Sequence, residues 1–339
     1  MKRKQLITAS ALIGLKAALL LWLISGSAAL ATTEEQINRR FAAQPGGTVV
    51  VEVDFGSVKV STNATSEVVV DVWRKVKRSK KADEEAFLKE SAVQFTQEGA
   101  TLTVRSHREK QSNWSSFWRG ATTTEARYAI IVPAQFNARL KTGGGGIKVT
   151  DLTGEVKAHT GGGGLTLTRV HGPLAGDTGG GGINARDCEG AIKLSTGGGG
   201  VDVNGGSGSL DLKTGGGDVS AKRFDGPARL HAGGGDLTVE HVTGEINGST
   251  GGGSIRAVLP SEIAADVKLS TGGGGVSVSI PTTAAFQLDA KTSGGGVSTE
   301  LPVTVVGKLA HGHLEGPVNG GGKAVVLRSG GGSIRLKKL

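Results

Sequence analysis

The stretch GGGGIKVTDLTGEVKAHT, residues 143–160, decides the fold, because the next 18 residues repeat its pattern as GGGGLTLTRVHGPLAGDT. Such glycine blocks return every 18 residues, and seven of them begin at Gly143, Gly161, Gly179, Gly197, Gly215, Gly233 and Gly251. A fixed period of this size indicates one small structural unit stacked on copies of itself. Later blocks follow at looser spacing and begin at Gly272, Gly294, Gly320 and Gly330.

Apolar and polar residues alternate between the blocks, and they do so in phase from one repeat to the next. Ile147, Val149, Leu152 and Val156 are the apolar positions of the first repeat. Such alternation is typical of strands with one buried face. Eighteen residues hold two short strands and two turns, but not a helical crossover, which needs about 30 residues. The sequence therefore predicts an all-β fold, a single-stranded parallel β-helix (β-solenoid) with two-sided coils, right-handed as parallel crossovers usually are.

Two further columns, meaning residues at the same position of successive repeats, have expected roles. The glycines should form corners whose backbone angles a residue with a Cβ resists. The fourth glycine is replaced by Asp218, Asp236 and Ser254 in later repeats, which predicts a turn position rather than a calcium site. The residue before each block should form an inward ladder that hydrogen-bonds along the stack; it is Thr142, Thr160, Thr178, Thr196, Thr214 and Thr250, with Ala232 as the exception.

Composition divides the chain into three parts. Residues 1–31 have a basic head, an apolar stretch and the small-x-small pattern Ala29-Leu30-Ala31, which predicts a signal peptide cleaved after Ala31. Residues 32–140 hold few of the 58 glycines and are expected to form a small β-rich cap with one short helix. Residues 141–339 form the glycine-rich solenoid. The net charge is +9, and it falls to +5 without the signal, which gives no support for a nucleic-acid partner.

Within the cap, the pattern predicts strands at 48–53, 57–61, 67–73 and 128–132, a helix over 83–91, and a hairpin of 93–96 with 101–106. The cap should cover the open edge of the first coil, and Lys337 and Lys338 should discourage pairing at the far end. The single cysteine, Cys188, lies in an apolar column and is expected to be a buried small residue rather than a nucleophile.

The order of these features resembles the bacterial "putative adhesin" family of exported proteins, a domain of unknown function. The resemblance rests on the strand pair around Gly56, the segment Tyr128-Ala-Ile-Ile-Val-Pro133, the Thr-Gly-Gly-Gly blocks and the ending Ser329-Gly-Gly-Gly-Ser-Ile-Arg-Leu336. It covers most of the chain after residue 46. It implies a β-solenoid with an adhesion label and without catalytic residues.

Motifs for catalysis and cofactors do not fit their required context. The glycine runs lack the Lys-Ser/Thr ending of a phosphate-binding loop and the helix of a dinucleotide site. Histidines show no HExxH spacing, and the pair His311 and His313 is the weak alternative for a metal. The outward columns that start at Lys148 and Thr150 mix residue types, which disfavours a glycan-active enzyme and an ice-binding face. We expect no catalytic residues, no metal and no cofactor.

Two features remain as candidate binding residues. The first is a run of basic residues that could bind anionic lipid or polysaccharide. Its core consists of Arg74, Lys75, Lys77 and Arg78, and it continues with Lys80 and Lys81. The second is an aromatic cluster that could stack on sugars or anchor a partner; it consists of Trp114, Phe117 and Trp118.

Three function hypotheses follow. The leading one is a non-enzymatic exported protein of the cell envelope or surface, an adhesin or scaffold that presents a rigid solenoid. The alternative is a periplasmic accessory or sensing protein whose basic cap binds anionic lipid or a membrane partner. A glycan-active β-helix enzyme is third. The expected partners are envelope polysaccharide, anionic lipid or a surface or membrane protein, with end-to-end association of rods as an open possibility. Periplasm and cell surface both remain open as locations.

Overall fold

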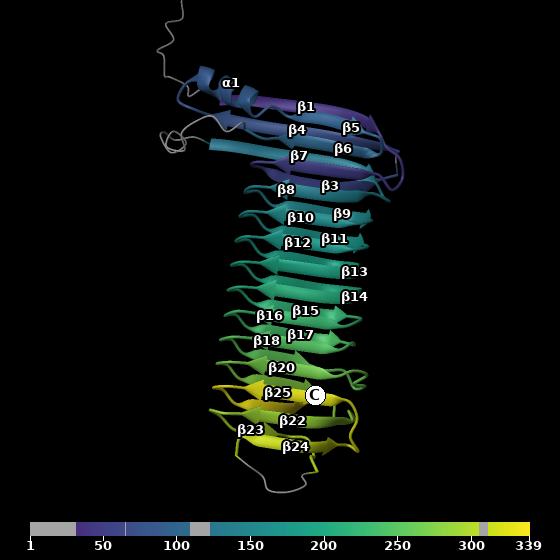
Figure 1. Cartoon of the computed structure of the whole chain (residues 1–339), viewed down its shortest axis with the longest axis vertical. Coiled ribbons are helices and arrows are strands. Elements are labelled where there is room, and N and C mark those ends of the chain that lie inside the picture. Colours follow the sequence, from purple (N-terminus) through teal and green to yellow (C-terminus); the bar gives the residue numbers. More distant parts are fainter. Residues whose placement is uncertain (1–31, 65, 109–122, 305–310) are drawn as a thin grey trace, which may run out of the picture.

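The computed structural model describes residues 32–64, 66–108, 123–304 and 311–339. These residues form a long rod of strands stacked across its axis (Figure 1), with one helix among them. The N-terminal part contains β1 (Thr32–Ala42), β2 (Thr48–Val53), β3 (Ser57–Asn63), β4 (Glu67–Lys77), α1 (Lys81–Glu90), β5 (Gln94–Glu98), β6 (Thr101–Ser106) and β7 (Thr123–Pro133). The predicted hairpin and helix are present, whereas β1 was not predicted and β4 continues through the first half of the basic run.

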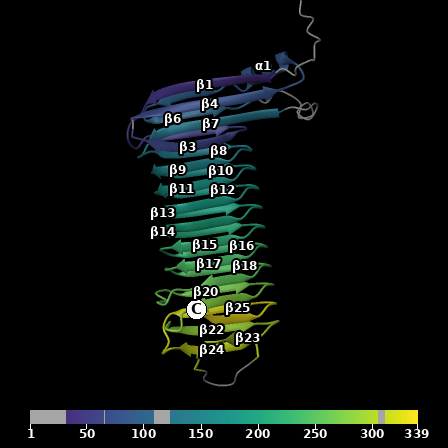
Figure 2. The same cartoon turned by 180° about the vertical axis from the view of Figure 1, so that it is seen from behind.

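The regular coils each place one strand on either side of the rod, as Figures 1 and 2 show from opposite sides. One side, the β10 face, carries β8 (Asn137–Thr142), β10 (Val156–Thr160), β12 (Leu174–Thr178), β16 (Ala228–Ala232), β18 (Ile246–Thr250) and β20 (Val267–Thr271). The other, the β11 face, carries β9 (Ile147–Thr153), β11 (Leu165–His171), β15 (Val219–Phe224), β17 (Leu237–Val242), β19 (Ile255–Val258) and β21 (Val276–Ile280). Two long strands cross both faces, β13 (Ile183–Thr196) and β14 (Val201–Thr214).

Pairing between coils is parallel and keeps the 18-residue register. Val156 pairs with Leu174 on the β10 face, and Ile147 pairs with Leu165 on the β11 face. The apolar columns point inward and are buried, including Cys188. This confirms the predicted parallel β-solenoid with two-sided 18-residue coils.

The glycine blocks lie at the corners, but the physical reason differs from the expected one. No block glycine from Gly143 to Gly275 has a φ between +20° and +160°. Instead, successive corners approach too closely for side chains: a Cβ on Gly163 would lie 2.2 Å from the carbonyl oxygen of Gly145. The fourth position is looser than the third, since a Cβ would lie 3.5 Å from the nearest atom at Gly182 and 3.0 Å from it at Gly164. This space permits Asp and Ser at the fourth position.

The left-handed backbone conformation occurs at the opposite corner of the coil. Asp151 has a φ of 61°, and Gly154 has a φ of 148°. The same conformation recurs one coil further at Arg169 and Gly172. It shifts the strand alternation by one residue, so that Leu152 turns inward.

The threonine ladder is inward and buried, as predicted, but its hydrogen bonds reach the glycine corners. Thr160 Oγ1 donates to the carbonyl oxygen of Gly145 at 2.8 Å and accepts from the backbone N–H of Gly163 at 3.2 Å. Thr178, Thr196 and Thr214 repeat this pair of bonds. Each threonine therefore ties a corner to the coil before it.

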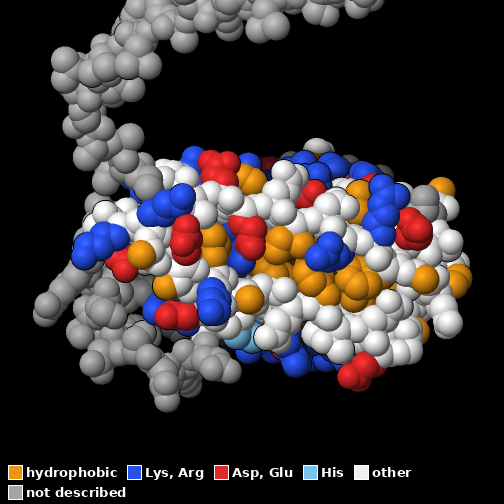
Figure 3. Space-filling model, turned by 90° about the horizontal axis from the view of Figure 1, so that it is seen from above, with side chains coloured by type: hydrophobic (Ala, Val, Ile, Leu, Met, Phe, Trp, Pro, Cys, Tyr) orange, Lys and Arg blue, Asp and Glu red, His pale blue; other side chains and the backbone are white. Residues whose placement is uncertain are grey.

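The N-terminal region is continuous with the stack. β2 lies between β6 and β8, and β3 lies between β7 and β9, all in parallel. Beyond them β4 runs antiparallel to β7, and β1 runs antiparallel to β4. Seen from this end, apolar side chains lie over the middle of the surface with charged side chains around them (Figure 3). The partly buried apolar residues of this region are Ile37, Phe41, Ala43, Phe55, Val93 and Phe95.

The C-terminal coils are stacked out of chain order. The remaining strands are β22 (Phe286–Thr292), β23 (Val297–Thr299), β24 (His313–Val318), β25 (Ala324–Ser329) and β26 (Ile334–Lys338). β25 pairs with β20 and β22, and β26 pairs with β21 and β23. The last coil of the chain therefore lies inside the stack, and the C-terminus with it (Figure 1).

The expectation that Lys337 and Lys338 protect the far end is wrong, because their strand, β26, has a neighbour on each side. The far end is formed by β23 and by β24, which runs antiparallel to β22. The prediction failed because it placed the coils in chain order.

Candidate functional site

A groove on the β10 face is a candidate binding site among the described residues. It has a volume of about 610 Å³ and crosses the strands from β2 to β14. Two outward columns line it. The first consists of Val50, Arg139, Lys157, Ala175, Lys193 and Asp211, and the second of Glu52, Lys141, His159, Asp177, Ser195 and Lys213.

The hollow follows from side-chain size along these columns. Ala175 lies between Lys157 and Lys193, its neighbours in the coils on either side. In the second column, Ser195 lies between Asp177 and Lys213. Short side chains between long ones leave a depression with a partly apolar floor and amines at its rim.

The polar groups of the groove are partly engaged with one another. Lys157 Nζ lies 2.6 Å from Glu155 Oε1, and this contact is the main cause that lowers the pKa of Glu155. Asp177 accepts a hydrogen bond from Ser195 Oγ at 2.8 Å and lies 2.8 Å from His159 Nδ1. Among the described residues, Lys141 and Lys193 have no ion pair. Their amines are therefore open to an external anion.

The predicted basic run does not form one surface. Arg74 faces inward on β4 in the same alternation as Val72 and Val76, and it is 1% exposed. Its guanidinium bonds Glu35, with Nε at 2.7 Å from Oε2, and Nη1 donates to the carbonyl oxygen of Ser91 at 2.6 Å. The prediction of Arg74 as a binding residue is therefore wrong, since burial and these partners make it part of the core.

The other residues of the run are more exposed but mostly engaged. Lys75 Nζ lies 2.9 Å from Glu34 Oε1, and this bond is the main cause that raises the pKa of Lys75. Arg78 lies over the Phe87 ring at 4.7 Å, and its burial is the first cause that lowers its pKa. Lys77 ends β4 half-buried, while Lys80 and Lys81 are exposed at the start of α1. The strand alternation of β4 thus separates residues that are adjacent in sequence.

Trp114, Phe117 and Trp118 lie outside the described residues, as does the predicted signal peptide, residues 1–31. Their assigned roles stay predictions. Among the residues that the structure does describe, no helix is long and apolar enough to cross a membrane.

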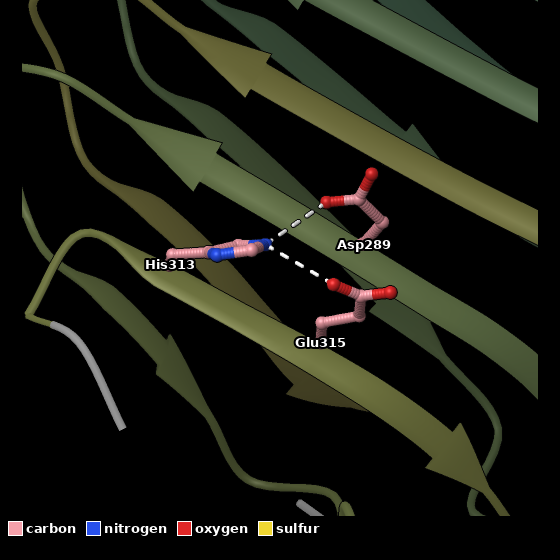
Figure 4. Close-up of side chains that lie close together, drawn as sticks. All are labelled: Asp289, His313 and Glu315. Carbon is pink, nitrogen blue, oxygen red and sulfur yellow. Dashed lines mark ion pairs between the residues drawn. The ribbon is translucent and has the colours of Figure 1, made fainter. Parts of the chain in front are cut away.

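A second polar cluster lies at the far end of the rod, where His313 points between Asp289 and Glu315 (Figure 4). His313 Nε2 is 3.3 Å from Asp289 Oδ1 and 3.6 Å from Glu315 Oε2. The three side chains offer one nitrogen and two carboxylate ligands. However, Arg328 of β25 donates to both carboxylate oxygens of Asp289, and it is the main cause that lowers the pKa of Asp289. We interpret the cluster as an ion-pair network that joins β24, β22 and β25.

The weak metal alternative paired His313 with His311. His311 precedes β24, and the atoms of its ring lie near Gly296. The two histidines therefore have different neighbours. Their expected alignment required one strand through both residues, but β24 begins only at His313.

The stacked coils define the chain as a β-solenoid protein, and the groove is an open polar hollow on one of its faces. It belongs to the Toastrack DUF4097 family, whose pattern matches residues 49–336. This confirms the resemblance seen in the sequence. None of the curated proteins compared with the chain matches it.

Solved structures match most of the chain at low identity and with low TM-scores. One, described as a "putative cell adhesion protein" from Clostridium sporogenes, is 13% identical, with 90% of this chain and 100% of that chain covered and a TM-score of 0.20. A "putative adhesin" from Bacteroides fragilis is 11% identical, with 90% and 97% covered and a TM-score of 0.29. A "Putative lipid binding protein" from Parabacteroides distasonis is 10% identical, with 90% and 96% covered and a TM-score of 0.27. Likenesses this distant carry no argument about function.

The sequence analysis missed the groove, although a signal for it exists. It followed the outward columns of the β11 face, which start at Lys148 and Thr150, and not those of the β10 face. Arg139, Lys157 and Lys193 recur at multiples of 18 residues, and this recurrence of basic side chains would have indicated one basic edge on the rod.

Proposed function

We propose that this protein is a non-enzymatic binding rod of the cell envelope or surface, an adhesin or scaffold, whose β10 face binds an extended acidic polysaccharide. The observation that supports this most is the groove, because it crosses successive coils and because Lys141 and Lys193 form no ion pair with any residue that the structure describes. Export rests on the predicted signal peptide.

The geometry favours a repeating polymer over a small ligand. Lys157 and Lys193 lie two coils apart, which corresponds to roughly 9–10 Å at the usual strand spacing. A chain laid across the strands therefore meets cationic side chains on several coils, from Arg139, Lys157 and Lys193. Since the stacked backbone is already ordered, little further ordering opposes binding. The groove is also open along its length, so the polymer can continue beyond it.

A binding role also fits the carboxylates of the groove better than catalysis does. Each of them already has a partner: Glu52 bonds Arg105 at 2.7 Å, Asp211 lies 3.4 Å from Lys213, and Asp177 contacts His159. A glycosidase needs two carboxyl groups that flank the bond it cleaves, one to donate a proton and the other to act as base or nucleophile. The alternative of a lipid-binding basic cap loses support, because Arg74 is buried and Lys75 is paired with Glu34.

The proposal predicts that Lys157→Ser together with Lys193→Ser weakens binding of alginate oligosaccharides at least tenfold, because the two substitutions remove amines on either side of the hollow. Binding can be measured by calorimetry at low salt, with neutral dextran as the uncharged comparison. Raising the salt concentration should weaken alginate binding to the unsubstituted protein, since exposed charges are screened.

The matched control is Lys59→Ser together with Lys148→Ser, two exposed lysines on adjacent coils of the β11 face. It removes the same charge from the opposite side of the same part of the rod, and we expect alginate binding to change less than twofold. Equal losses in both double variants would show that only net charge matters and would overturn the proposed site. So would an unsubstituted protein that binds dextran as well as alginate.

A further inference from the structure

A second hollow lies on the β11 face near the C-terminal end of the rod. It exists because the C-terminal coils are stacked out of chain order. Arg256 of β19 pairs with Ser277 of β21, and Ser277 pairs with Arg335 of β26. These three residues therefore form one outward column, although 79 positions separate the two arginines in the sequence. If the coils followed chain order, Arg335 would not lie next to Ser277.

The hollow has a volume of about 260 Å³ and is centred on short side chains. Ser277 lies between the two arginines, whose Cα atoms are roughly 9–10 Å apart at the usual strand spacing. Lys337, two residues after Arg335 on the same face of β26, adds a third cation at the rim. Hydroxyl groups surround these cations, from Thr238, Ser254, Ser277 and Ser333.

The cations of this hollow differ from many others on the rod in having no partner. Arg328, Arg169 and Arg105 each bond a carboxylate, whereas Arg256, Arg335 and Lys337 have neither an ion pair nor a side-chain hydrogen bond among the described residues. The one acid that lines the hollow is Asp236, and its Oδ1 accepts the backbone N–H of Ser254 at 2.7 Å. The hollow therefore has a net positive charge and a surplus of hydrogen-bond donors.

We propose that this hollow, the Arg256–Ser277–Arg335 site, binds a phosphate-type oxyanion, either free phosphate or the phosphoryl group of a lipid. A guanidinium donates two parallel hydrogen bonds to phosphate oxygens, which makes arginine the side chain suited to such groups. Two arginines, a lysine and serine hydroxyls reach the space above Ser277 from several sides. A tetrahedral anion offers oxygens in all these directions, whereas a carboxylate offers only two.

This site is independent of the groove on the β10 face, because the two lie on opposite sides of the rod and share no residue. A failure of alginate binding would leave the phosphate site intact, and the reverse also holds. The two proposals are therefore tested separately.

The test uses the double variant Arg256→Ser with Arg335→Ser and inorganic phosphate as the probe. Phosphate binding is followed by broadening of the phosphorus NMR signal, at constant ionic strength kept with chloride. We expect the unsubstituted protein to bind phosphate and the double variant to bind at least tenfold more weakly. Both arginines are exposed, so thermal unfolding should stay unchanged and a folding defect would be visible there.

The control is Arg229→Ser with Lys268→Ser, which removes two exposed cations from the β10 face. It should keep phosphate affinity within twofold. An unsubstituted protein that does not bind phosphate, or equal losses in the two double variants, would overturn the proposal.

Vesicles distinguish the two sources of the phosphoryl group. Phosphatidic acid vesicles should sediment with the protein if the site takes lipid headgroups, and inorganic phosphate should then displace them. Phosphate binding without vesicle binding assigns the site to soluble phosphoryl groups. Vesicle binding that survives Arg256→Ser with Arg335→Ser contradicts a lipid headgroup at this site.

Discussion

Alanine in place of Gly199, the third glycine of its block, is expected to destabilise the solenoid by about 3 kcal/mol or more. A Cβ there would lie 2.1 Å from the carbonyl oxygen of Gly181 and 2.4 Å from its carbonyl carbon. Both obstacles are backbone atoms of the preceding coil, so no side-chain rotation can relieve the overlap. The two coils must move apart, which also breaks the bond that Thr196 Oγ1 makes to the carbonyl oxygen of Gly181.

Gly198 provides the matched control in the same block. A Cβ there would lie 3.8 Å from its nearest atom, which is ordinary contact. Gly198→Ala should therefore change the free energy of unfolding by less than about 1 kcal/mol, or raise it slightly by restricting the unfolded chain. The midpoints of urea-induced unfolding of the two variants test this difference in stability. If both variants lower the midpoint equally, the glycines are needed for backbone angles and not for close approach.

Arg74→Met is expected to have the second-largest effect, at the N-terminal end of the rod. Methionine keeps an unbranched apolar chain but removes the guanidinium, so the carboxylate of Glu35 loses its partner and the carbonyl oxygen of Ser91 keeps only the bond from the Ser106 hydroxyl. The carboxylate of Glu35 that is left behind is about a third exposed and can be hydrated, so we expect a loss of about 2 kcal/mol, less than for a fully buried pair. Because Arg74 also lies 3.5 Å from the carbonyl oxygen of Leu88, near the end of α1, the loss should fall first on this helix.

Hydrogen exchange of residues 81–91 measures that loss locally. Exchange of the helix amides in Arg74→Met should be faster by roughly thirtyfold, which corresponds to about 2 kcal/mol. Lys75→Met is the control, since its pair with Glu34 is exposed to solvent and contributes little to stability. Equal exchange in the two variants would show that Arg74 does not stabilise the helix.

The sequence predicted the regular part of the rod well, because each inward column repeats one physical requirement. Ile147, Val149 and Leu152 recur as buried apolar positions, and the threonine before each block recurs as a corner tie. The reason for the glycines was not predictable in the same way. Close approach between coils and unusual backbone angles both demand glycine, and only the stacked backbone distinguishes them.

The two ends and the two candidate sites were harder to predict for a common reason. A repeat pattern gives the position of a residue within its coil but not the order in which coils stack. β2 and β3 come before β6 and β7 in the chain but lie between them and the first regular strands, β8 and β9. β26 comes after β23 in the chain but lies between β21 and β23. Arg256 and Arg335 therefore meet across Ser277 through a pairing that the sequence does not show. Likewise, Arg74 was assigned to a basic run because the predicted strand ended at Trp73, whereas β4 continues through Arg74 to Lys77.

The measurement that tests this account most directly is disulfide formation between coils at the C-terminal end. Ser277→Cys with Arg335→Cys places two cysteines on paired positions of adjacent strands, within the Cα separation of about 4.4–6.8 Å that a disulfide allows. Ser277→Cys with Ser298→Cys is the comparison, because β26 lies between these strands and holds the two residues roughly 9–10 Å apart. The native Cys188 should not interfere, since it is buried and its burial raises the pKa of the thiol. The account predicts rapid oxidation of the first pair and none of the second. Oxidation of the second pair and not the first would show that the coils follow chain order, and it would remove the Arg256–Ser277–Arg335 site with them.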